Sequence, residues 1–122
     1  MIDRTSENIL KILANEFKII GITGPRQSGK TTLAKKVFNN KKYVILENPD
    51  HRLFAEDDPR GFLSQYSDGV IIDEIQHVPV LFSYLQELVD STDEVGKFII
   101  TGSQNFNLIE KKDTHQFPHL EL

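Results

Sequence analysis

Apolar residues in this sequence fall into two kinds of segment. Short, uninterrupted apolar runs bounded by Gly, Pro, Asn or Asp are typical of strands buried on both faces of a parallel sheet. Such runs predict strands at residues 17–22, 43–46, 70–72 and 97–101. Apolar residues that recur every three or four positions predict helices at residues 6–15, 30–38 and 79–90, and shorter helical pieces within 50–66.

Strands and helices alternate along the chain, which indicates an α/β fold class. Parallel strands joined by helices require right-handed crossovers, so the helices are expected to cover both faces of a mainly parallel sheet. The length of 122 residues suits a single three-layer domain. Within it we assign residues 1–16 to an N-terminal helical segment. Residues 110–122 are expected to form a tail that is either disordered or a rudimentary strand.

A phosphate-binding motif follows the first predicted strand. Residues 24–31 read GPRQSGKT and fit G-x-x-x-x-G-K-[ST], directly before a predicted helix. Backbone N–H groups of such a loop and the positive end of the helix attract phosphate. Because the motif lies between a predicted strand and a predicted helix, we favour this interpretation over a chance glycine-rich turn. Lys30 is expected to neutralise the phosphates of ATP, and the Thr31 hydroxyl to ligate Mg²⁺. The predicted nucleotide-binding residues are Gly24, Pro25, Arg26, Gln27, Ser28, Gly29, Lys30, Thr31 and Thr32.

Two carboxylates follow the third predicted strand. Asp73 and Glu74 come directly after Val70-Ile71-Ile72, at the carboxyl end of the sheet where ligands bind. Asp73 is expected to hold the magnesium ion or its water, and Glu74 to polarise the attacking water. The alternative is an acidic turn that caps the following helix. The phosphate-binding loop earlier in the chain favours the catalytic interpretation.

A third polar group ends the fourth predicted strand. In a sheet where this strand lies between the other two, its end faces the γ-phosphate, where a hydroxyl or amide can bind phosphate or water. Ser103 is the first candidate for this sensor role, and Thr101 and Gln104 are alternatives. A Gly-Ser turn that caps a helix from about Gln104 would also explain these residues.

Composition narrows the classes of partner. The formal net charge is -4, so no global basic field indicates nucleic acid. The sequence contains no Cys, which excludes disulfides and fits a reducing compartment. No stretch approaches the roughly 20 apolar residues of a membrane span. We therefore expect a soluble, cytoplasmic protein without a membrane partner.

Three strings in the chain resemble the AAA-type prokaryotic P-loop ATPases. They read GPRQSGKTTL at 24–33, IIDEIQHVP at 71–79 and FIITGSQNF at 98–106, and the resemblance covers about residues 4–109. It implies a P-loop domain of the additional-strand, catalytic-glutamate type, with strand order 5-1-4-3-2. It also implies ATP and Mg²⁺ as ligands at the residues named above.

The chain departs from this family after the sensor strand. Family members continue into an arginine-containing segment, a fifth strand and a further domain, so we expect this chain to be C-terminally truncated. No Arg follows Arg60, and an arginine finger contributes roughly 10³ to 10⁵ in turnover, so any hydrolysis is expected to be slow without a partner. The first strand, 17–22, would lie at an open edge that recruits a partner or a second copy unless the tail covers it.

Other nucleotide-binding functions share the phosphate-binding loop. A small-molecule or nucleotide kinase usually brings several arginines to the phosphates, and only four are present. A GTPase is disfavoured because no Asn-Lys-x-Asp segment occurs. A nucleotide-binding remnant without catalysis stays an open alternative to an ATPase.

Overall fold

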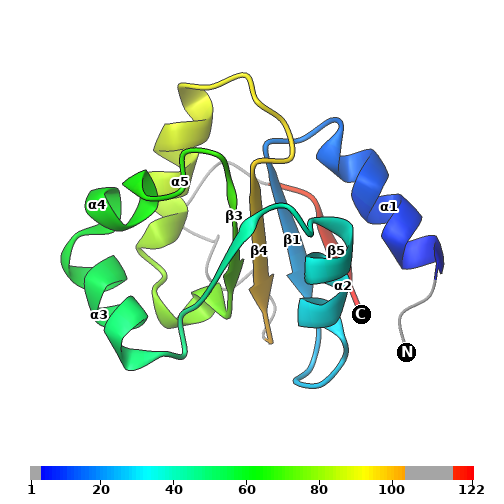
Figure 1. Cartoon of the computed structure of the whole chain (residues 1–122), viewed down its shortest axis with the longest axis horizontal. Coiled ribbons are helices and arrows are strands. Elements are labelled where there is room, and N and C mark those ends of the chain that lie inside the picture. The colour runs from blue at the N-terminus through cyan, green and yellow to red at the C-terminus, as the bar shows by residue number, and fades with distance from the viewer. Residues whose placement is uncertain (1–3, 104–116) are drawn as a thin grey trace.

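Parallel strands form one five-stranded sheet in the computed structural model, which describes residues 4–103 and 117–122 (Figure 1). Its strand order is β2-β3-β4-β1-β5, which confirms the predicted order 5-1-4-3-2. The strands are β1 (Ile19–Thr23), β2 (Lys42–Ile45), β3 (Val70–Asp73), β4 (Phe98–Gly102) and β5 (His119–Glu121). Because all pairings are parallel, the carboxyl ends of the strands meet at one edge of the sheet.

Helices cover both faces of the sheet, as the alternating pattern predicts. Figure 1 shows α1 and α2 on one side of it and α3, α4 and α5 on the other. The helices are α1 (Arg4–Ala14), α2 (Lys30–Val37), α3 (Pro49–Asp57), α4 (Pro59–Ser64) and α5 (Leu81–Asp90), with a 3-10 turn η1 (Ile75–His77). In the part of the chain that the structure describes, no helix is long and apolar enough to span a membrane.

Side chains alternate between the two faces of each strand, which creates two separate cores. Ile20 and Ile22 of β1 pack with Leu33 of α2 in one core, whereas Ile19 packs in the other core with α4 and α5. Both faces of the sheet are therefore dry, which explains why the strands read as continuous apolar runs. The cores fix β1, β3 and β4 in the centre of the domain, and these strands carry the polar residues described below.

The first strand starts later than its apolar run predicts. The prediction placed it at 17–22, but β1 begins at Ile19 and the side chain of Phe17 is exposed. The backbone N–H of Phe17 donates to the carbonyl of Leu13 in the turn that follows α1, and its carbonyl accepts from Gly96 N, so Phe17 lies just before the strand.

The final described segment supplies the fifth strand. Its backbone pairs with β1, since Gly21 N donates to the carbonyl of Pro118 at 2.9 Å and Leu122 N donates to the carbonyl of Thr23 at 2.8 Å. Phe117 stacks on Phe82 with ring centroids 6.0 Å apart, on the opposite face from Leu120, which packs with the α1–α2 core. Within the predicted tail, residues 119–121 form this strand and cover the edge of β1, whereas residues 110–116 lie outside the described residues.

Removing residues 117–122 should therefore expose the edge of β1 and open both cores. We expect the free energy of unfolding to fall by about 3 kcal/mol or more, because Phe117 and Leu120 lose their packing. We also expect concentration-dependent self-association by light scattering, because the N–H and C=O groups of β1 lose their partners. The variant Glu121→Ala is the matched control, since Glu121 is exposed and its backbone pairing is retained. Unchanged mass and stability in the deletion would contradict the role of β5.

Candidate functional site

The phosphate-binding loop joins β1 to α2 with an unusual backbone. Gln27 and Gly29 have positive φ angles of 66° and 92°, and such alternating left-handed residues turn successive N–H groups toward one concavity. Gly24, at the start of the loop, has no room for a side chain. A Cβ there would lie 2.7 Å from the Ser28 hydroxyl and 3.2 Å from Cβ of Leu122. A side chain at Gly24 would therefore displace the Ser28 hydroxyl, and Gly29 has a backbone conformation that favours glycine.

The N-terminus of α2 has no side-chain cap. Gly29 occupies the cap position and offers no side-chain oxygen, whereas the side chain of Asn48 accepts two backbone N–H groups at the start of α3 and that of Asp58 accepts one at the start of α4. The first N–H groups of a helix need acceptors, and an anion at this position would supply them. The loop thus presents the donors that a phosphate group requires.

Asp73 lies at the end of β3 and accepts three hydrogen bonds. The Thr31 hydroxyl donates to its Oδ2 at 2.8 Å, the Tyr43 hydroxyl donates to the same oxygen, and the Thr101 hydroxyl donates to Oδ1. The carboxylate is only 2% exposed, so these donors replace the water that it lacks. Asp73 therefore connects α2, β2 and β4 at one point.

Tyr43 is a site residue that the sequence interpretation missed. It lies on β2, and its alternation with Val44 places it on the α2 face of the sheet. The ammonium of Lys35 lies 3.9 Å from the centroid of its ring. Burial and the hydrogen bond to Asp73 raise the pKa of Tyr43 well above its usual value, so the phenol stays protonated and remains a donor at neutral pH.

Glu74 has a left-handed backbone, with φ 59° and ψ 50°. This conformation is uncommon for a residue other than glycine and costs on the order of 1–3 kcal/mol. The Ser103 hydroxyl donates to Oε2 of Glu74 at 2.7 Å, and the Gln76 amide donates to the same oxygen at 3.1 Å. The other oxygen, Oε1, lies 3.4 Å from the Lys30 ammonium. Both side chains of this ion pair are buried, so the pair has little solvent screening.

The helix-capping interpretation of Glu74 is not supported. Glu74 precedes η1, but its side chain makes no capping hydrogen bond. Its backbone N–H instead donates to the Thr101 hydroxyl at 3.1 Å. The carboxylate faces Lys30 and Ser103, so its position is set by the start of α2 and the end of β4.

A cavity of about 200 Å³ lies over the loop and between the two carboxylates. Most of its lining comes from charged or polar side chains: Arg26, Gln27, Lys30, Thr31, Glu47, Asp73 and Glu74. The guanidinium of Arg26 is largely exposed and pairs with Glu47. That contact raises the pKa of Arg26 and lowers the pKa of Glu47.

The structure brings together most, but not all, of the predicted site residues. Lys30, Thr31, Asp73, Glu74 and Ser103 are linked by direct contacts. Pro25 and Thr32 are exposed and do not line the cavity. Thr101 hydrogen-bonds Asp73 and the Glu74 backbone, and Gln104 lies outside the described residues.

Gln76 and Glu47 also belong to the site, although the motifs did not single them out. Gln76 donates to both Glu74 and the Ser103 hydroxyl, each at 3.1 Å. Gln76 lies only two residues after Glu74. A turn predicted directly after the strand would have indicated that the two side chains lie close together. Glu47 follows β2 and pairs with Arg26, which lies in the loop between β1 and α2.

The donor set suits a magnesium ion. The Thr31 hydroxyl and the Asp73 carboxylate are oxygen donors 2.8 Å apart beside the cavity, and magnesium prefers oxygen ligands. Glu74 Oε1 is buried and has no hydrogen-bond donor among the described residues, apart from its ion pair with Lys30. The described residues thus fit a magnesium ion with a phosphate group in the cavity.

Residues 16–118 match the model of a family of AAA domains. The chain belongs to this AAA-domain family. The match spans the phosphate-binding loop, the acidic pair and the sensor strand, and the five-stranded parallel sheet formed by the described residues is that of a P-loop ATPase core. The resemblance seen in the three sequence strings is therefore confirmed.

Curated relatives of this AAA domain are longer proteins. The chain is 39% identical over 94 residues to proteins of Mycobacterium tuberculosis and Mycobacterium bovis, both described as uncharacterized, and the match covers 75% of this chain and 21% of each relative. The AAA domain thus spans about a fifth of the length of these relatives.

Solved structures share the fold of the AAA domain at low sequence identity. The crystal structure of a DNA replication initiation factor has a TM-score of 0.62 and 18% identity, over 97% of this chain and 44% of that one. A Walker-type ATPase of Pyrococcus abyssi has a TM-score of 0.61 and 13% identity, over 99% of this chain and 53% of that one. At such identity the likeness shows the fold alone.

Tyr43→Phe tests the connection between β2 and the acidic pair. The variant keeps the ring beside Lys35 and removes one donor from the buried Asp73 carboxylate, so the free energy of unfolding should fall by about 1.5 kcal/mol. Urea denaturation of the nucleotide-free AAA domain measures this. Tyr66→Phe is the matched control, since Tyr66 lines a different cavity. Equal stability of the parent and Tyr43→Phe would show that water replaces the phenol at Asp73.

Proposed function

We propose that this AAA domain binds ATP with magnesium and hydrolyses it slowly. One observation carries the proposal: the Lys30 ammonium, the Thr31 hydroxyl and the buried carboxylates of Asp73 and Glu74 converge on one cavity above an uncapped helix N-terminus. An anionic ligand of the phosphate type would satisfy the helix donors and Lys30 together. AAA family membership supports the choice of ATP among such ligands.

Lys30 is expected to change partner when the phosphates bind. In the structure it pairs with Glu74 at 3.4 Å, which is longer than a good charge-assisted hydrogen bond. The phosphates carry more negative charge and have several acceptor oxygens, so they would draw the ammonium away from Glu74. The Oε1 atom of Glu74 would then be available as a proton acceptor.

Glu74 is proposed to act on the attacking water. The water oxygen forms a bond to the γ-phosphorus, the bond from this phosphorus to the β–γ bridging oxygen breaks, and Glu74 accepts the water proton. Ser103 and Gln76 hold Oε2 and leave Oε1 facing the loop, so they orient the base. Thr31 and Asp73 are the proposed magnesium ligands, and the ion would supply charge neutralisation at the phosphates.

Turnover by the isolated chain is proposed to be slow. The sequence has no arginine after Arg60, and Arg60 itself pairs with Glu87 away from the loop. Arg26 lines the cavity but is paired with Glu47. A partner or a second copy that supplies an arginine would therefore increase the rate.

Magnesium and ATP should raise the melting temperature of the protein. At a ligand concentration near 100 times Kd, the stabilisation is about 2.7 kcal/mol, which differential scanning fluorimetry resolves readily. Lys30→Ala should abolish the shift, because the phosphates lose their principal counter-charge. Lys36→Ala is the matched control on the same helix, since its side chain is exposed and pairs with Glu7. Absence of a shift with ATP, GTP or their magnesium complexes would exclude the proposed ligand.

Glu74→Gln should separate binding from hydrolysis. The amide keeps the size of the side chain but loses the proton acceptor, so phosphate release should fall by about 10²-fold or more while the melting shift with magnesium and ATP persists. Parent turnover is measured first as phosphate release at saturating ATP. If binding persists and the parent shows no turnover above solvent background, the chain is a nucleotide-binding remnant. Equal turnover of parent and variant would exclude Glu74 as the base.

A further inference from the structure

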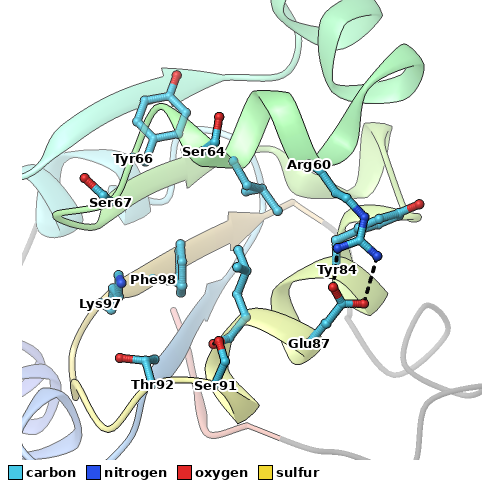
Figure 2. Close-up of a pocket in the computed structure, with 12 residues that line it drawn as sticks. Arg60, Ser64, Tyr66, Ser67, Tyr84, Glu87, Ser91, Thr92, Lys97 and Phe98 are labelled. Atoms are coloured by element: carbon cyan, nitrogen blue, oxygen red, sulfur yellow. Dashed lines mark hydrogen bonds and ion pairs between the residues drawn. The ribbon is translucent and has the colours of Figure 1, made fainter.

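A second, larger cavity lies far from the phosphate-binding loop. Its volume is about 430 Å³, and it lies between α4, α5 and the start of β4 (Figure 2). Phe98 begins β4 and Ser67 precedes β3, so the cavity opens at the amino ends of the parallel strands, opposite the nucleotide site. Small-molecule sites commonly have volumes of 300 to 1,000 Å³ and mainly apolar linings.

Apolar side chains form the body of this cavity. Leu63 and Phe98 are buried and form its inner surface, where they belong to the larger core. The rings of Tyr66 and Tyr84 and the side chain of Leu88 complete its walls, and Leu88 is 37% exposed. A flat apolar group placed here would remove the exposed part of Leu88 from water, which favours binding at about 25 cal/mol for each Å² buried.

One end of the cavity is positively charged. Lys97 lies there with Ser67 and Thr92 (Figure 2), and its side chain is only 16% exposed. Among the described residues, Lys97 forms an ion pair with Glu94, which is 3.9 Å away and 67% exposed and compensates a buried ammonium poorly. The pKa of the neighbouring Lys41 is lowered, mainly by burial. Glu94 and Asp68 act to raise this pKa, whereas repulsion from the Lys97 charge acts to lower it.

The opposite end of the cavity is electrically neutral. Arg60 makes two hydrogen bonds to the Glu87 carboxylate, and its guanidinium carbon lies 5.2 Å from the ring centroid of Tyr84 (Figure 2). Hydroxyl protons of two lining serines are engaged, since Ser64 donates to the carbonyl of Gly61 and Ser91 donates to that of Leu88. An anionic group on a ligand would therefore favour the Lys97 end.

We propose that this cavity binds a small amphipathic anion. Its flat, largely aromatic body packs on Phe98, Leu63 and Leu88, and its carboxylate or sulfonate pairs with Lys97. The Lys97 ammonium lies 5.8 Å from the ring centroid of Phe98, which sets the spacing between the apolar and anionic parts of the ligand. The site is separate from the phosphate-binding loop and does not depend on the proposed function.

The anionic fluorophore 8-anilinonaphthalene-1-sulfonate tests both parts of the site. Titration of the whole chain should give saturable binding at one site, with increased fluorescence. Lys97→Met should raise Kd about tenfold or more, because it removes a charge-assisted contact and keeps the length of the side chain. Lys11→Met is the matched control, since Lys11 is exposed on α1, across the sheet. The neutral analogue N-phenyl-1-naphthylamine should bind more weakly than the anion and with equal Kd to the parent and Lys97→Met.

Leu88→Trp tests the location independently of charge. The larger side chain fills the cavity, so binding of the anion should be lost while the circular dichroism spectrum stays unchanged. Amide chemical shifts in the parent should change at Ser67, Thr92 and Lys97 when the anion binds. A separate pocket, lined by Phe17, Gln86 and Asp90 among others, is the alternative location. No saturable binding, an equal Kd for the anion in Lys97→Met, or chemical-shift changes confined to that pocket would overturn the proposal. If Leu88→Trp does not fold, the Lys97→Met comparison and the chemical shifts decide.

Discussion

The three hydrogen bonds to the Asp73 carboxylate hold the candidate site together. They join the helix that follows the phosphate-binding loop, the strand that carries Tyr43 and the strand that carries Thr101. Because the carboxylate is buried and charged, leaving any of its bonds unmade is unfavourable. The charge therefore makes the relative positions of α2, β2 and β4 interdependent. Glu74 follows directly in the chain, so its position depends on the same three contacts.

Glu74 shows how a strained backbone is stabilised by its surroundings. Its left-handed conformation turns the side chain away from a capping role, and contacts from three elements hold the carboxylate in place: Lys30 from α2, Ser103 after β4 and Gln76 within η1. Such strain persists only where neighbouring groups fix the conformation. Of these neighbours, the ATPase proposal assigns Lys30 to the phosphates, and Ser103 and Gln76 to the orientation of the Glu74 carboxylate. In this arrangement Glu74, the proposed base, therefore contacts Lys30, the proposed counter-charge of the phosphates.

Local patterns in the sequence predicted most of the fold, because buried parallel strands and amphipathic helices have distinct periodicities. The loop, Asp73, Glu74 and Ser103 were found for the same reason: each follows an apolar strand. Tyr43 and Glu47 were missed because they enter the site only through the pairing of β2 with β3, which no local pattern encodes. Phe17 was assigned to a strand because hydrophobicity alone does not distinguish a paired apolar residue from one in the turn between a helix and a strand. The cavity beside Lys97 joins residues of α4, α5 and β4, so it too depends on tertiary packing.

The pairing of β1 has a consequence for the order of folding. Ile19 pairs with Phe98 and Gly21 pairs with His119, so β1 is translated early, whereas both of its partner strands are translated late. Closing such long loops costs entropy before any contact compensates for it, which makes parallel sheets of this kind slow to form. During synthesis on the ribosome, both edges of β1 therefore stay unpaired until β4 and β5 have been translated. Until its partners emerge, this apolar segment has unpaired edges of the kind that make folding intermediates prone to aggregate.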